Sequence, residues 1–183
     1  MDDLGTSTNL YKAGAIDWNP SGNIPSPFLP YFREYSDYQR GEYQATYFYS
    51  FNVTRPPFDD ARVRRALCLA VDREAIARDL LKGTRRAWGN FVPSGYPGYE
   101  APPPQRFDPD EARRELARAG YPEGRGFPTF TLLFNTSEDH RRIAEAVQAM
   151  WRRELNLPVE LRNMENASLV SALNTLTYDV ARR

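Results

Sequence analysis

The most constraining part of the sequence runs from residue 47 to residue 83, where an aromatic segment, a pair of prolines and two helical patterns follow one another without a break. Tyr47, Tyr49 and Phe51 recur at every second position, which predicts a strand with one face packed inward. Pro56 and Pro57 have no backbone N–H and a fixed φ, so the chain has to leave the sheet there.

Two capped helices are predicted after these prolines. Asp59 or Asp60 is placed to cap the first helix, whose apolar residues (Val63, Ala66, Leu67 and Ala70) recur at helical spacing. Asp72 is placed to cap a second helix over residues 73–82, and Gly83 to end it in the left-handed region.

The remaining patterns alternate between helix and strand. They predict, in chain order, a short helix or turn over 9–18, a loop over 19–30, a short helix within 28–38, an irregular but packed segment over 84–107, a helix over 108–120, a strand over 129–135, a helix over 138–155 that stops at a left-handed Asn156, a strand over 158–163, a helix over 168–174 and a strand over 177–181. Strands that alternate with helices indicate an α/β lobe with a mixed sheet covered by helices.

Charge and hydropathy exclude several classes of protein. Lys plus Arg and Asp plus Glu both number 24, so the chain lacks the basic surface of a nucleic-acid binder, and we expect no nucleic-acid partner. No window has the length and apolar character of a membrane span, and the acidic start of the chain does not resemble a signal peptide. The single cysteine, Cys68, lies on the apolar side of the first predicted helix, where we expect a small core residue.

The sequence contains no recognisable catalytic motif. His140 is the only histidine, and its position on the polar side of the long predicted helix suggests a solvent-exposed residue. Asp59, Asp60 and Asp72 are explained by their capping positions. There is no metal-binding or phosphate-binding motif, so we expect no catalytic residues, no metal and no cofactor.

The central stretch nevertheless carries a specific resemblance. The pattern N-x-x-R-P-P-F-D-D-x-R-V-R-x-A-L over residues 52–67, followed by A-V-D-R-E-A-I over 70–76, resembles the extracytoplasmic solute-binding proteins of family 5, the oligopeptide- and dipeptide-binding proteins of ABC importers. The likeness continues through residues 91–93, 108–120 and 131–137. Upstream, residues 11–17 resemble a segment that connects the two lobes in that family.

This resemblance implies that the chain is most of the C-terminal lobe of a two-lobed binding protein. Residues 1–46 are then a lobe-connecting segment with an aromatic-rich loop, and residues 47–183 are a partial C-terminal α/β lobe. The implied function is to capture peptides, or a related small solute, outside the cytoplasmic membrane and deliver them to the permease. Such a protein is not an enzyme. It is periplasmic or extracytoplasmic, is monomeric, and is associated with the membrane only through the transporter. Its export signal would lie outside this chain.

The resemblance also selects candidate ligand-binding residues. Residues 178–182, Y-D-V-A-R, are similar to an F-D-V-A-R strand whose arginine lies near the bound peptide, which makes Arg182 the matching residue. Asn166 stands where the peptide binders have a tryptophan, and Leu173 stands where they have an arginine. The alternative for Arg182 is a strand-end cation that faces water.

Aromatic residues gather in the first part of the chain, and Trp18 is the one that we select as a candidate. These rings either pack over the core of the lobe or line a ligand cleft, where they bury area at little entropic cost. They are Trp18, Phe28, Tyr31, Phe32, Tyr35, Tyr38 and Tyr43.

Two other functions are compatible with the sequence. The chain could be an isolated protein-interaction module derived from such a lobe, or a hydrolase that uses carboxylates. Permease and ATPase genes beside its gene would argue against the first alternative, and an activity assay would test the second.

Overall fold

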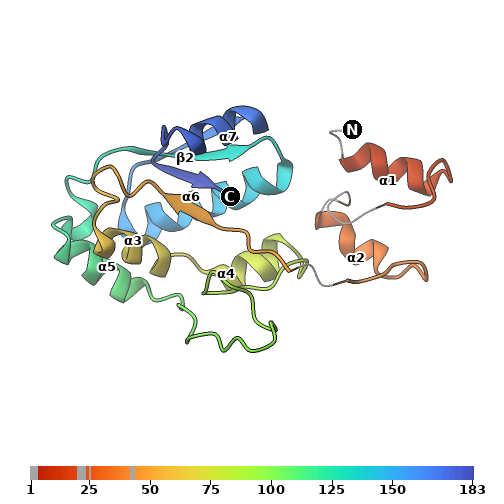
Figure 1. The fold of residues 1–183 in the computed structure, drawn as a ribbon, viewed down its shortest axis with the longest axis horizontal. Helices are drawn as coiled ribbons and strands as arrows, with labels where there is room; N and C mark the ends of the chain where they lie inside the picture. The colour runs from red at the N-terminus through yellow and green to blue at the C-terminus, as the bar shows by residue number, and fades with distance from the viewer. Residues whose placement is uncertain (1–3, 20–23, 25, 42–43) are drawn as a thin grey trace.

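The computed structural model of the protein describes residues 4–19, 24, 26–41 and 44–183 (Figure 1). Its centre is a sheet with the strand order β1-β4-β2-β3. The strands are β1 (Tyr49–Phe51), β2 (Phe130–Asn135), β3 (Val159–Met164) and β4 (Val180–Arg182). β2 is parallel to both β3 and β4, whereas β1 is antiparallel to β4. The predicted mixed α/β sheet is therefore confirmed.

Helices cover both faces of this sheet, and α7 lies on the opposite side from α3, α5 and α6 (Figure 1). The helical elements of the lobe are α3 (Ala61–Leu69), α4 (Arg73–Ala75), the π-helical turn η2 (Ile76–Leu80), α5 (Pro109–Arg118), the short 3-10 turn η3 (Pro122–Gly124), α6 (Glu138–Leu155) and α7 (Asn166–Asn174). The N-terminal part contains α1 (Leu4–Lys12), the 3-10 turn η1 (Ser26–Phe28) and α2 (Leu29–Phe32).

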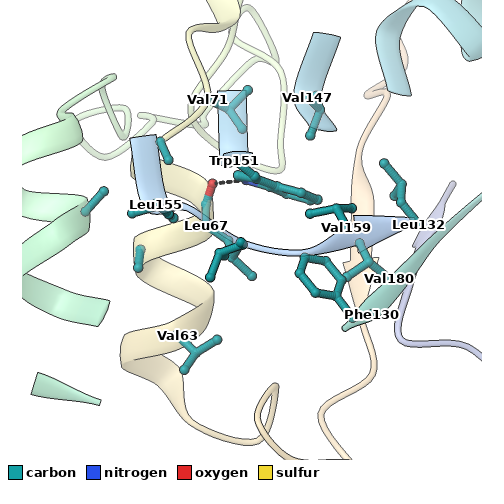
Figure 2. Packing of buried hydrophobic residues seen from close by; sticks show 14 of the residues in the cluster. Val63, Leu67, Val71, Phe130, Leu132, Val147, Trp151, Leu155, Val159 and Val180 are labelled. Carbon is teal, nitrogen blue, oxygen red and sulfur yellow. Dashed lines mark hydrogen bonds between the residues drawn. The ribbon is translucent and has the colours of Figure 1, made fainter. Parts of the chain in front are cut away.

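The larger core fills the space between the sheet and α3, α5 and α6 (Figure 2). Trp151 of α6 is at its centre, is 2% exposed, and donates its indole N–H to the carbonyl oxygen of Leu67 on α3 at 2.8 Å. Leu132 of β2 and Val180 of β4 join this core, whereas the next residue along each strand joins the smaller cluster under α7. The alternation of a strand thus divides its side chains between two buried clusters.

The two predicted helix starts are confirmed. The Asp60 carboxylate accepts a hydrogen bond from the backbone N–H of Arg62 at 2.8 Å, so Asp60 and not Asp59 caps α3. Asp72 accepts from the N–H of Ala75 at 2.9 Å and caps α4. The predicted helix over 73–82 is shorter than expected, because it continues as η2 only to residue 80 before the chain turns through the positive φ of Gly83.

The longest helix has the predicted bounds, because α6 begins at Glu138 and ends at Leu155, and Asn156 has the left-handed φ of 54°. Gly124 packs against this helix end. A Cβ atom on Gly124 would lie 2.4 Å from the carbonyl oxygen of Leu155, and its φ is +75°, so only glycine fits.

The last strand begins three residues later than the predicted 177–181. Asn52, which is 1% exposed, donates its side-chain amide to the carbonyl oxygens of Leu176 and Tyr178 at 2.9 and 2.8 Å. The Asp179 carboxylate accepts from the N–H of Thr131 at 3.0 Å. Side chains therefore satisfy the backbone before residue 180, and the ladder starts only afterwards.

The N-terminal part agrees least with prediction. The helix expected within 9–18 is α1, which begins five residues earlier and ends before the positive φ of Gly14. Of the loop expected over 19–30, residues 20–23 and 25 lie outside the described residues, as does Tyr43. Contacts between the described residues of this part and the lobe include the Ser26 hydroxyl, which donates to Asp139, and Arg33, which donates to the carbonyl oxygen of Lys82.

The segment over 84–107 was predicted to be irregular and packed; it is irregular, but it is packed only in part. It contains no helix or strand, yet its rings at Phe91, Tyr96 and Tyr99 are exposed. The segment is held by polar contacts, in which the Trp88 indole donates to the carbonyl oxygen of Val92 and the Asn90 amide to that of residue 102, and by the Phe91 ring, whose centre is 4.9 Å from that of Phe48.

Candidate functional site

A polar cluster lies where β2 and β4 end. Both strands run in the same direction, so Asn135 and Arg182, their last residues, reach the same edge of the sheet. β1 runs the other way, and the pairing of Tyr49 with Arg182 places the start of β1 at this edge as well. The carboxyl ends of parallel strands are the usual position for ligands in open α/β sheets. We call Tyr47, Tyr49, Arg85, Asn135, His140 and Arg182 the Arg182 cluster.

Arg182 is half-buried and incompletely satisfied. One of its terminal nitrogens donates to Oδ1 of Asn135 at 3.3 Å, and its guanidinium lies 5.2 Å from the centre of the Tyr47 ring. Its Nε atom is buried and has no hydrogen-bond partner among the described residues. An N–H that is kept from water without an acceptor is costly, so this nitrogen is suited to an acceptor supplied by a ligand.

His140 is part of this cluster, and the prediction that it is solvent-exposed was wrong. Its ring is half-buried, with Nδ1 2.8 Å from Oδ1 of Asn135 and the ring centre 5.5 Å from that of Tyr47. Burial, followed by the charges of Arg182 and Arg85, lowers the pKa of His140 to about 4. The imidazole is therefore neutral at neutral pH.

The two tyrosines complete the walls of the cluster. Their hydroxyl oxygens are 3.3 Å apart, and burial raises the pKa of both phenols, so both carry their proton. The Tyr47 ring also lies 5.1 Å from the guanidinium of Arg85, which follows η2. One aromatic ring thus contacts two guanidinium groups.

No carboxylate of the part of the chain that the structure describes forms an ion pair with the arginines of the cluster. None of the ion pairs between described residues involves Arg85 or Arg182. Two cations beside neutral tyrosines and a neutral histidine are an arrangement suited to a carboxylate or another anion, since arginine binds such groups through parallel N–H groups. The described residues contain no group of three or more acidic, histidine or cysteine side chains that could hold a metal ion.

Of the three predicted ligand-binding residues, only Arg182 belongs to the cluster. Trp18 is 74% exposed in the N-terminal part, and Asn166 is exposed as the first residue of α7. Among the described residues, no hydrogen bond or ring contact joins either side chain to the cluster. Leu173 packs against the buried cluster under α7, which gives this position a structural role. Trp18 and Asn166 remain predictions as ligand contacts.

Sequence reasoning missed the other five members of the cluster as site residues, namely Tyr47, Tyr49, Arg85, Asn135 and His140. Asn135 ends a predicted strand, and His140 lies in the first turn of the next predicted helix. Both positions are expected at the carboxyl edge of the sheet, so the sequence could have indicated them as site residues. Arg85 follows a helix end and gave no such signal. Cys68, predicted as a core residue, is half-buried, and burial raises the pKa of its thiol.

Comparison with known proteins identifies the class to which this fold belongs. The model of the bacterial extracellular solute-binding proteins, family 5 Middle, matches residues 1–183, and the chain belongs to this family. None of the helices described is both long enough and apolar enough to span a bilayer.

Particular relatives cover nearly all of this chain. The periplasmic murein peptide-binding protein MppA of Escherichia coli is 37% identical over 188 residues, which are 96% of this chain and 34% of that protein. The periplasmic oligopeptide-binding protein OppA of Escherichia coli is 32% identical over 185 residues, 97% of this chain and 34% of that protein. The chain therefore spans about a third of the length of these curated relatives.

Solved structures give the same result. The periplasmic oligopeptide-binding protein of Borrelia burgdorferi superposes with a TM-score of 0.86 at 30% identity. The match covers 100% of this chain and 36% of the Borrelia chain. The murein tripeptide binding protein MppA of Escherichia coli gives a TM-score of 0.87 at 32% identity over 100% of this chain and 37% of that chain.

Proposed function

We propose that this chain forms part of the substrate-binding component of an ABC importer and that Arg182 binds an acidic group of a peptide, or of a related small solute. The observation that carries the proposal is the buried Nε of Arg182, which has no partner among the described residues and lies in a cationic cluster at the carboxyl edge of the sheet. A carboxylate would supply the missing acceptor.

The relatives support a peptide as the ligand. The names of two of them specify oligopeptides and murein peptides, and the OppA protein of Haemophilus influenzae, with a TM-score of 0.79 at 27% identity, was solved with the peptide RPPGFSPFR. Every peptide with a free C-terminus carries one carboxylate at a constant position in its backbone. Recognition of this group would tolerate many side chains, as a broad peptide importer requires.

The wider proposal concerns the complete binding protein. Residues 47–183 would supply one wall of a ligand cleft, and residues 1–46 would connect it to a second lobe. Closure of two lobes around a ligand is a hinge motion that sequesters it and creates a surface for the permease. We place this protein outside the cytoplasmic membrane, as a monomer that contacts the membrane through the transporter.

The test is calorimetric titration of the full-length protein with tri-, tetra- and pentaalanine and with their C-terminal amides. We expect at least one free-carboxylate peptide to bind more tightly than its amide, and Arg182→Ala to remove this preference. Arg183→Ala is the matched control, because the side chain of Arg183 is exposed beside the site. The proposal would be overturned if no free-carboxylate peptide bound. It would also be overturned if Arg182→Ala and Arg183→Ala preferred the free-carboxylate peptide over its amide to the same extent.

A further inference from the structure

Asn135 connects the two most important side chains of the Arg182 cluster. Its Oδ1 atom is 3.3 Å from a terminal nitrogen of Arg182 and 2.8 Å from Nδ1 of His140. Arginine can only donate, so the atom of Asn135 that faces it has to be the oxygen. The same oxygen then requires Nδ1 of His140 to donate, which leaves Nε2 of the neutral ring without a proton.

The groups that face His140 are mostly cationic or neutral. Arg182 on β4 and Arg85 after η2 are positive, and Tyr49 at the start of β1 and Tyr47 just before it keep their protons. On α6 itself, Asp139 is the acidic group that opposes the two arginines, and it also accepts a hydrogen bond from Ser26. Glu138 and Arg141 pair with each other at 2.7 Å, and Arg142 follows them.

We infer that His140 takes up a proton when an acidic group of a ligand binds beside Arg182, and that Asn135 is the residue that positions His140 for this step. The inference rests on the proposed function. The anion would offset the two guanidinium charges that oppose protonation of the imidazole. The proton comes from the solvent and forms an N–H bond at Nε2, so that the imidazolium becomes a further donor beside the ligand.

The sign of the pH dependence follows from this coupling. A negative charge within about 4–6 Å favours a charged imidazole and moves a pKa by roughly 1–3. If the pKa of His140 rises from about 4 to about 6 on binding, affinity for an acidic peptide increases about tenfold between pH 7 and pH 5. The amide of the same peptide brings no charge, so its affinity changes little over this range.

Calorimetry of the full-length protein with the alanine peptides and their amides tests the inference at pH 5, 6 and 7. At pH 6, two buffers with different heats of ionisation give the number of protons taken up on binding. We expect uptake with the carboxylate peptide, none with the amide, and no uptake by His140→Gln. If the carboxylate peptide binds and requires Arg182, but without proton uptake, the inference is overturned while the proposed function stands. If no free-carboxylate peptide binds, both are overturned.

The positioning role of Asn135 has its own readout. The ring nitrogens of His140, assigned by comparison with His140→Gln, report the tautomer in nitrogen-detected NMR. We expect the proton on Nδ1 in the parent protein and a shift toward Nε2 in Asn135→Leu. Asn163→Leu is the matched control, because Asn163 lies on β3 of the same sheet and accepts from Thr136 instead. An unchanged tautomer in folded Asn135→Leu would show that Asn135 does not position the ring.

Discussion

The two ends of β2 differ in how completely their surroundings satisfy polar groups. Phe130 begins the strand in the core beside Trp151, with ring centres 5.7 Å apart, and the indole N–H there has a carbonyl partner. Asn135 ends the strand in the Arg182 cluster, where a guanidinium nitrogen is buried without one. One strand thus connects a closed apolar core to an incompletely satisfied polar edge.

This difference separates residues that stabilise the lobe from residues that are available to a ligand. A buried group that already has every partner adds to the free energy of unfolding and offers nothing to a second molecule. A buried cation without an acceptor reduces that free energy and contributes only when a ligand supplies the acceptor. Substitutions at the two ends of β2 should therefore affect different measurements.

The largest effect is expected at the core end. Trp151→Ala should lower the free energy of unfolding by about 3–5 kcal/mol, because it removes a large buried ring and leaves a cavity. Trp151→Phe is the control that keeps an aromatic ring and loses the bond to Leu67, so it should cost less. Urea denaturation measures both, and equal midpoints for parent and Trp151→Ala would show that this core is not the main source of stability.

The reverse result is expected at the polar end. Arg182→Ala should weaken binding of a free-carboxylate peptide by about 30-fold or more, since truncating one partner of a buried charge pair costs at least about 2 kcal/mol. Its melting temperature should not fall, because the unbound guanidinium is incompletely satisfied. A lower melting temperature with unchanged affinity would make Arg182 a structural residue and remove the distinction between the two ends.

The sequence predicted the core end better than the polar end. The bounds of α6, its left-handed stop at Asn156 and the caps Asp60 and Asp72 all follow from interactions within a few residues. Periodicity and capping are local properties, so they can be recognised without knowing the fold. The mixed sheet followed from the alternation of such elements.

The cluster could not be predicted in the same way, because its members come together only through strand order. Arg85 and Arg182 are distant in sequence, and both contact Tyr47. His140 looks exposed when only its own helix is considered, yet its ring contacts Tyr47 and Asn135 at the edge of the sheet and is half-buried. The late start of β4 has the same kind of cause, namely the long-range bonds of Asn52 to residues 176 and 178.

A smaller effect is expected at the start of α3, which belongs to neither end of β2. Asp60→Ala should cost about 1 kcal/mol of stability through loss of the helix cap, whereas Asp59→Ala should be nearly neutral because Asp59 caps nothing. Neither change should alter peptide affinity. Denaturation and titration of both variants test this, and a loss of affinity in either would place a ligand contact far from the Arg182 cluster.

The smallest effect is the contribution of His140, at the polar end, to the pH dependence of stability in the absence of ligand. The pKa of His140 is about 4 in the folded chain and near its ordinary 6.5 when unfolded, so between these values the unfolded state binds more protons. Stability from this residue is present above pH 6.5 and is lost as the pH falls toward 4. Because the ring is only half-buried and solvent screens its charge, we expect a loss of about 0.5–1 kcal/mol between pH 7 and pH 5.

Other groups titrate in the same range, so the test is a difference between parent and His140→Gln. The carboxylates of Asp60 and Glu138, whose pKa values are lowered by Arg62 and Arg141, contribute equally to both proteins and cancel. The variant should lose less stability than the parent between pH 7 and pH 5, as measured by urea denaturation at each pH. Parallel curves would mean that the imidazole is as easily protonated in the folded chain as in the unfolded one. The polar edge would then be open to solvent, and it would differ from the core only in how exposed it is.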